Sequence, residues 1–358
     1  MNQRIEEKTG RLRYFDALRG FSMIFVVFSH VMVLSMGLTD VKDSMVNWVI
    51  MTFRMPLFFF VSGFFAYRVC TRWTASLVGD VIKRKIQAQI IGTIVFYSLF
   101  LFCHDQEVFY WLHGGFGAYW FTITLFQMFM IFLALSLLSR LFCSEHVLDI
   151  GLLLVSSIYF LSFGMPAIKE FWASPLGNIL SCEHVITYFQ FFALGIFCRK
   201  YWNKSAYLLT KDWLKTSSIV IFAACLIVIK SNSYFQIFPP PPILSKSVSI
   251  LVRYAGLMVV VSFFFNKEKY FNEGHLTGSL LEYIGRRTLD IYLLHYFFLP
   301  NLKFLQPFLT TGNTVIIQLF IGITVSAAII TLCLLISNVL RSSNFLASWL
   351  FGVKPPPK

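Results

Sequence analysis

The polar side chains of the first apolar segment are the residues of this chain best suited to chemistry. Residues 14–36 read YFDALRGFSMIFVVFSHVMVLSM, a run long enough to span a bilayer. Its ionisable and polar side chains nevertheless include Asp16, Arg19, Ser29 and His30. A charged side chain at bilayer depth costs at least about 2.5 kcal/mol, so such residues usually face a protein interior or a wet cavity. The segment therefore predicts a reaction centre or a transport pathway.

Arg19 and His30 lie on nearly the same face of this helix. They are eleven residues apart, which is about 3.06 helical turns and roughly 16 Å along the axis. An imidazole ionises near neutral pH and suits the role of a general base, so His30 is the candidate base. Arg19, near one membrane surface, is a candidate for binding phosphates or for an ion pair with Asp16. The alternatives are a membrane-boundary anchor for Arg19 and a helix-packing role for His30.

The second apolar segment carries a further cation at a similar depth. Arg54 lies about eight residues below the outer end of residues 46–67, and His30 about six below the outer end of its own helix. Both therefore lie roughly 10 Å inside the outer boundary, where they can meet across an antiparallel helix pair. Pro56 predicts a distortion beside them, because proline has no N–H to donate. The alternative is that Arg54 snorkels or pairs with a carboxylate such as Asp43.

The composition identifies the class of protein that must hold these side chains. The chain of 358 residues is 57% hydrophobic, 18% aromatic and only 13% charged, which is too little polar surface for a soluble globule. Its net charge of +13 gathers in connections between apolar segments, as cytoplasmic loops do, which argues against a nucleic-acid partner. The seven cysteines form no CxxC pair, so neither a metal site nor a disulfide framework is predicted.

Ten apolar segments have a length that can span a bilayer, and in lipid they must be helices. They are residues 15–36, 46–67, 86–103, 119–138, 148–163, 184–200, 213–230, 247–265, 283–300 and 314–338. Lysine and arginine alternate between the connections in a way that predicts cytoplasmic termini. We therefore expect an all-α integral membrane protein with a cytoplasmic segment 1–13, a membrane domain 14–340 and a cytoplasmic tail 341–358. The oligomeric state is not predicted.

Four motifs, in order along the chain, resemble those of one family. They are LRG followed by a histidine eleven positions after its arginine, FRMPLFFFVSGFF at 53–65, YWFTITLF at 119–126 and LEYIGRRTLDIYLLHYFF at 281–298. From about residue 12 to 340 the chain resembles the acyltransferase 3 family, and within it the fucose 4-O-acetylase-like group. The resemblance implies a multi-span enzyme that moves an acyl group, usually acetyl from cytoplasmic acetyl-CoA, to a sugar hydroxyl on the outer side.

The resemblance also assigns functional residues. It implies that His30 and Arg19 are the functional pair and that Ser62 and Gly63 carry the serine-glycine motif of the second span. The family's basic stretch usually ends in an R-x-x-R-like pattern and a proline, whereas this chain has KRKIQAQ. We expect the phosphates of coenzyme A to bind at this stretch, through Arg68, Lys83, Arg84 and Lys85.

Acyl transfer to an alcohol makes its own demands on these side chains. His30 would remove the hydroxyl proton or, as an alternative, form an acyl-imidazole. The thioester oxygen becomes negative in the transition state, and either Arg54 or a backbone amide near Ser62 and Gly63 would stabilise it. No metal is required.

Three further residues are candidates for binding the acceptor. Tyr119 and Trp120 begin the fourth span at the outer surface, where they either stack on a sugar or belong to the aromatic belt of the membrane. His295 lies in the middle of the ninth span and either lines a cavity or bonds between helices.

The sequence thus predicts an O-acetyltransferase of the bacterial inner membrane, surrounded by membrane lipid. It acts on a surface or exported glycan, or on the lipid-linked precursor of one. The alternative is a transporter or flippase for a lipid-linked sugar. A lipid, peptide or amine acceptor and a succinyl-CoA donor also remain open.

Overall fold

The computed structural model describes residues 13–67, 73–162, 165–235, 242–272, 275–311 and 314–353, which form helices and loops without a strand. Seven helical segments in this part of the chain are long and apolar enough to cross a membrane. They are Arg13–Ser35, Met45–Ala66, Ala75–Cys103, Gly117–Leu141, Asp212–Ser231, Lys246–Asn266 and Val315–Ser342. The expected all-helical membrane architecture is confirmed, whereas the total of ten spans and the cytoplasmic termini stay predictions.

The chain divides into two compact units, which are described separately. The first unit comprises Met1–Val61, Asn203–Thr288 and Leu299–Thr331. The second comprises Ser62–Trp202, Leu289–Phe298 and Leu332–Lys358.

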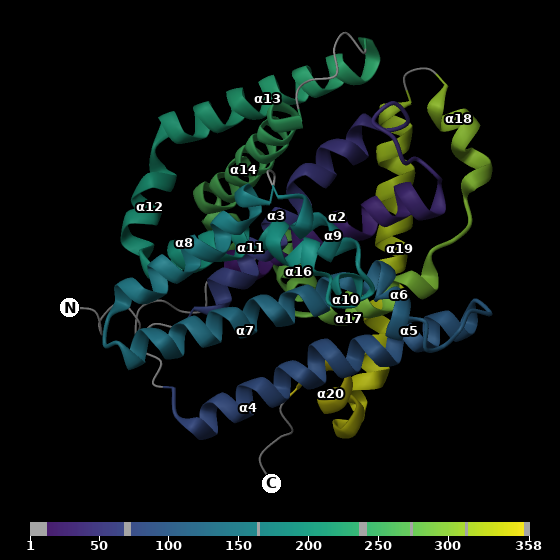
Figure 1. The fold of residues 1–358 in the computed structure, drawn as a ribbon. Coiled ribbons are helices and arrows are strands. Elements are labelled where there is room, and N and C mark those ends of the chain that lie inside the picture. Colours follow the sequence, from purple (N-terminus) through teal and green to yellow (C-terminus); the bar gives the residue numbers. More distant parts are fainter. Residues whose placement is uncertain are drawn as a thin grey trace. The chain divides into compact units, whose positions relative to one another are not determined.

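In the first unit, α2 (Arg13–His30) packs along α16 (Leu276–Arg286), and α13 (Asp212–Phe235) packs along α14 (Pro242–Asn266) (Figure 1). A π-helical turn, η1 (Val31–Ser35), continues α2 without a break. The unit also contains parts or all of α3 (Met45–Ala66), α12 (Trp202–Thr210), α15 (Glu268–Asn272), η5 (Lys303–Leu305), α18 (Gln306–Thr310) and α19 (Val315–Ser342). Long apolar runs form these helices because each satisfies its own backbone hydrogen bonds.

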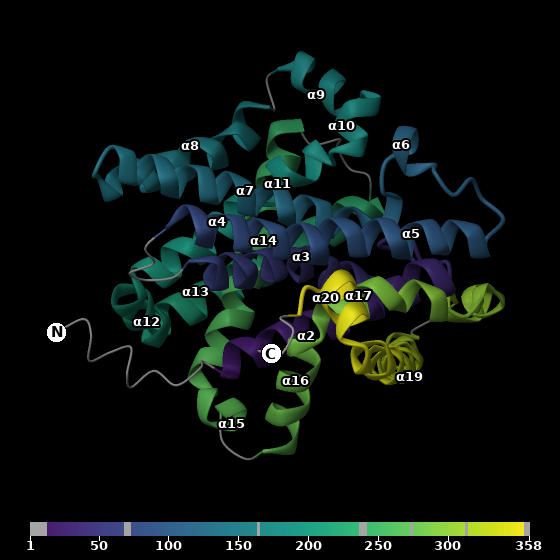
Figure 2. The same ribbon diagram turned by 90° about the horizontal axis from the view of Figure 1, so that it is seen from below.

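In the second unit, one long helical segment pairs antiparallel with α7 (Trp120–Leu141). It consists of α4 (Ala75–Lys85), the π-helical η2 (Ile86–Ile91) and α5 (Gly92–Cys103), which follow one another directly (Figure 2). The hydroxyls of Thr93 and Thr122 are 2.6 Å apart, and Arg140 donates to the carbonyl of Trp73 at 3.2 Å. The predicted span 86–103 is therefore the second half of a longer helical segment that starts at Ala75.

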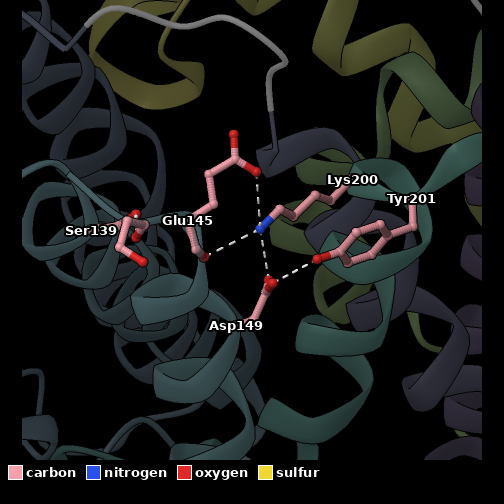
Figure 3. Close-up of polar contacts among 6 residues, drawn as sticks. Ser139, Glu145, Asp149, Lys200 and Tyr201 are labelled. Carbon is pink, nitrogen blue, oxygen red and sulfur yellow. Dashed lines mark hydrogen bonds and ion pairs between the residues drawn. The ribbon is translucent and has the colours of Figure 1, made fainter. Parts of the chain in front are cut away.

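An ion-pair cluster joins α8 (Glu145–Leu161) to the end of α11 (Cys182–Lys200) in the same unit (Figure 3). Lys200 Nζ lies 2.9 Å from Asp149 Oδ1, and the Tyr201 hydroxyl donates to Asp149 Oδ2 at 2.6 Å. The Lys200 ammonium also donates to the carbonyl of Glu145 at 3.3 Å. The remaining elements of the unit are α6 (Trp111–Gly114), η3 (Gly117–Tyr119), α9 (Pro166–Ala173), α10 (Pro175–Ile179), α17 (Thr288–Leu294), η4 (His295–Phe298) and α20 (Asn344–Phe351).

The predicted ninth span, 283–300, is not one helix. Helix α16 ends at Arg286, because Arg287 has φ −112° and ψ 15°, outside the helical region. After α17 the chain tightens into the 3₁₀ turn η4. The predicted tail 341–358 is also partly helical. It contains α20, which packs against η2 and α5.

Candidate active site

Arg19 is held on α2 by a residue from a distant part of the first unit. Its Nη2 donates to Thr288 Oγ1 at 2.9 Å, and Thr288 is almost completely buried. Asp16, one turn earlier on α2, is buried as well. Arg19 is half-buried, so a threonine hydroxyl orients a guanidinium that still has access to solvent or ligand.

Arg54 reaches from α3 to α2. Ser22 Oγ donates to the backbone carbonyl of Arg54 at 3.0 Å, and Arg54 Nη1 donates to the carbonyl of Val26 at 3.3 Å. In a regular α-helix, the Val26 carbonyl accepts the backbone N–H of His30. The guanidinium therefore lies within one helical turn of His30. The carboxylate of Asp43, the alternative partner for Arg54, accepts the backbone N–H groups of Thr39 and Asp40.

His30 is the last residue of α2 and is half-buried. The next five residues form the π turn η1, in which the Met36 N–H donates to the Val31 carbonyl at 3.0 Å. Such π turns interrupt the α-helical ladder and are frequent at functional sites. The turn places His30 at an irregularity of the helix, at a half-accessible position.

The serine-glycine motif of α3 belongs to the second unit. A Cβ atom on Gly63 would lie 1.9 Å from the carbonyl oxygen of Phe192 on α11. Only glycine allows two helices to approach so closely, so packing alone accounts for Gly63. Ser62 beside it is half-buried.

Tyr119 and Trp120 have different surroundings in the second unit. Tyr119 is fully buried, its hydroxyl donates to the Leu293 carbonyl at 3.0 Å, and its ring lies against Tyr296. Tyr119 therefore packs inside the second unit, and its stacking on a sugar stays a prediction. Trp120 is half-buried and stacks on His184, with ring centroids 3.9 Å apart.

His295 is also completely buried, at the start of η4. Its Nδ1 lies 3.0 Å from the carbonyl of Ile291 and 2.8 Å from that of Tyr292. Carbonyl oxygens only accept, so Nδ1 carries the proton. The imidazole thus donates through Nδ1 to carbonyls of the preceding helix, α17.

The expected coenzyme A residues lie at the end of α4, apart from Arg68, which is outside the described residues. Lys83 is exposed, and Arg84 donates to the carbonyl of Asp80 on its own helix at 3.2 Å. The Lys85 ammonium lies 4.7 Å from the ring centroid of Phe129 on α7. The three cations therefore point in different directions. Among the described residues, no group of three or more His, Cys, Asp or Glu could hold a metal ion.

Two interactions could not be found from the sequence. The Arg19–Thr288 bond joins residues 269 positions apart. The fully buried carboxylate of Asp290 binds both Arg341, at 2.7 and 2.8 Å, and Ser337. An acidic residue inside an apolar span was the only available signal for the second interaction.

The first unit offers a base with one cation within a helical turn of it and a second cation further along α2. An imidazole at the end of α2 lies within one turn of a guanidinium from α3, and a second guanidinium lies eleven residues earlier on α2. An imidazole can remove a hydroxyl proton, and a cation can stabilise a developing oxyanion.

Comparison with known proteins identifies the family of this chain. The model of an acyltransferase domain family, acyltransferase 3, matches residues 12–337. Neither the curated proteins nor the solved structures gave a match. The family match includes Arg19, His30, Arg54 and the buried Asp290, and it covers all but the ends of the chain. This protein is therefore a member of the acyltransferase 3 family of membrane proteins.

Proposed function

We propose that this acyltransferase moves an acetyl group from cytoplasmic acetyl-CoA to a hydroxyl of a cell-surface or exported glycan, or of its lipid-linked precursor. The observation that carries the proposal is the bond from Arg54 to the Val26 carbonyl, which brings a cation within one helical turn of His30. The proposed location is the bacterial inner membrane. The proposed sugar acceptor follows from the resemblance of the sequence motifs to the fucose 4-O-acetylase-like group, which is itself part of the proposal.

The proposed reaction needs one proton carrier and one oxyanion stabiliser. His30 removes the proton from the acceptor hydroxyl as its oxygen attacks the thioester carbonyl. Arg54 stabilises the negative oxygen of the tetrahedral intermediate. The carbon–sulfur bond then breaks, and the leaving thiolate of coenzyme A takes the proton back from the imidazolium. The products are the acetyl ester and coenzyme A.

Other cations are proposed to hold the donor. The side chains of Arg68, Lys83, Arg84 and Lys85 suit phosphate groups. Among them, Lys85 lies over the buried ring of Phe129.

The test is transfer of radiolabelled acetyl from acetyl-CoA into the glycan fraction of membranes with matched amounts of each variant. We expect His30→Ala to reduce labelling by about 100-fold or more, the usual contribution of a general base. His146→Ala is the matched control, because His146 is exposed on α8. Equal labelling by the native chain and His30→Ala would remove His30 from the mechanism. No label with the native chain would favour another donor or the alternative of a transporter or flippase.

A further inference from the structure

Ser29 Oγ, in a residue that is 0% exposed, and Asn47 Oδ1, in a residue that is 2% exposed, are buried polar atoms of the first unit with no hydrogen-bond partner among the described residues. Leaving a buried polar group unpaired is unfavourable, and such groups in native proteins call for an explanation. Ser29 directly precedes His30.

The spacing of these two residues from a contact between α2 and α3 predicts that they lie at the same level of the two helices. Ser22 on α2 bonds to Arg54 on α3 at 3.0 Å. Seven residues are about 1.94 helical turns, so a step of seven returns to the same face. Seven residues after Ser22 is Ser29, and seven before Arg54 is Asn47. Because the helices run in opposite directions, both steps move to the same level.

The contacts of Asn47 show which of its side-chain atoms is left without a hydrogen bond. Its backbone N–H bonds to Ser44 Oγ at 3.2 Å, and Ser44 in turn donates to Gln318 at 2.7 Å. Its Nδ2 contacts the sulfur of Met51 at 3.6 Å. The remaining atom, Oδ1, is an acceptor that needs a donor.

The pair therefore has complementary requirements. Asn47 Oδ1 needs an incoming donor, whereas the Ser29 hydroxyl can donate to an incoming acceptor. An alcohol group both donates and accepts, so it satisfies the two atoms together. A carbonyl has no proton to give Asn47, and an ammonium has no lone pair for Ser29.

We propose that Ser29 and Asn47 bind a hydroxyl group of the acceptor next to the hydroxyl that His30 deprotonates, so that the acceptor is a sugar with two neighbouring hydroxyls. This inference rests on the proposed function and assigns the acceptor side of its site. Both atoms are closed off from solvent in the described state. Entry of the sugar therefore requires local separation of α2 and α3 at this level, beside the π turn η1.

The test compares Ser29→Ala and Asn47→Leu with the native chain in the same labelling assay, together with thermal unfolding of each purified variant in detergent. We expect labelling to fall by about 10-fold or more, with an unchanged KM for acetyl-CoA. We also expect an unchanged or higher unfolding temperature, because removing an unpaired buried polar group does not weaken a fold. Ser29→Thr keeps the hydroxyl and should recover labelling.

Ser262→Ala is the matched control. Ser262 lies on α14 of the same unit and is likewise buried, with no hydrogen-bond partner for its Oγ among the described residues. It should label as the native chain does. Native-level labelling by Ser29→Ala and Asn47→Leu would overturn the inference. So would a loss that parallels a lower unfolding temperature, or a raised KM for acetyl-CoA. Absence of label with the native chain would instead overturn the proposed function on which the inference rests.

Discussion

Gly20 and Gly285 touch backbone to backbone where α2 crosses α16. A Cβ atom on Gly20 would lie 2.0 Å from the carbonyl oxygen of Leu281, and one on Gly285 would lie 1.9 Å from that of Asp16. Both glycines belong to motifs on which the family resemblance rests, LRG and IGRR. The crossing brings α2 close enough to α16 for Arg19 to reach Thr288 just beyond the end of α16.

Alanine at either glycine should destabilise the first unit. The added methyl group would collide with backbone atoms, which cannot turn away as a side chain can, so the two helices must separate. Overpacking of this kind costs about 1–3 kcal/mol. We expect a lower unfolding temperature in detergent and weaker acetyl transfer for Gly20→Ala and Gly285→Ala. Gly79→Ala is the control, because a Cβ atom there meets nothing within 4 Å, and its unfolding temperature should not fall.

Removal of the Thr288 hydroxyl should affect Arg19 without removing the cation. Hydrogen bonds to charged groups contribute about 1.5–3 kcal/mol, so Thr288→Val should reduce kcat/KM for acetyl transfer by roughly 10-fold or more if Arg19 orientation controls catalysis. Thr288→Ser keeps an acceptor oxygen and should retain most activity. Native-level activity of Thr288→Val would show that the hydroxyl of Thr288 is not required.

The sequence predicted the long helices well because bilayer-length apolar runs have few alternatives. The expected spans 15–36 and 46–67 correspond to Arg13–Ser35 and Met45–Ala66. It predicted α4 poorly, since Asp80 and the basic triplet resemble a cytoplasmic connection. The helix continues through them because the segment pairs with α7, a tertiary contact that no local pattern reports.

The site could also be predicted in part, because polar residues stand out inside apolar runs. Polar residues inside apolar runs directed attention to Arg19, His30 and Arg54, and the last of these does reach α2. The burial of Tyr119 was not predictable, because it depends on distant tyrosines such as Tyr296. Motif spacing therefore located the candidate chemistry, whereas packing partners had to come from the structure.

The Tyr201–Asp149 bond should make stability depend on pH at the end of α11. The hydrogen bond to the Asp149 carboxylate raises the pKa of Tyr201 above its ordinary value of 10.0. A folded-state pKa above the unfolded one means that the contribution is complete below pH 10 and is lost as the pH rises through the folded-state pKa. We expect Tyr201→Phe to lower the unfolding temperature by a constant amount from pH 8 to about 10 and by less above that range.

The effect of Tyr201→Phe is compared with that of Lys200→Met, measured in the same pH series. The Lys200 side chain is only 5% exposed, so its loss leaves Asp149 without a buried counter-ion. Lys200→Met should therefore lower the unfolding temperature more than Tyr201→Phe at every pH. A Tyr201→Phe effect that does not change above pH 10 would contradict the raised pKa.

The ion pair between Asp290 and Arg341 should be the most sensitive polar contact of the second unit. Asp290 is 0% exposed and is bound by two guanidinium nitrogens, so Arg341→Met removes two charge-assisted hydrogen bonds from a buried carboxylate. Breaking a buried pair in this way costs about 3–5 kcal/mol, whereas replacing both partners by apolar residues is often nearly neutral. We therefore expect Asp290→Leu and Arg341→Met each to lower the unfolding temperature strongly, and the double variant to recover much of the loss.

Thermal unfolding of the three variants in detergent gives the coupling between the two sites. Additive losses in the double variant would show that the two side chains stabilise the unit independently of each other.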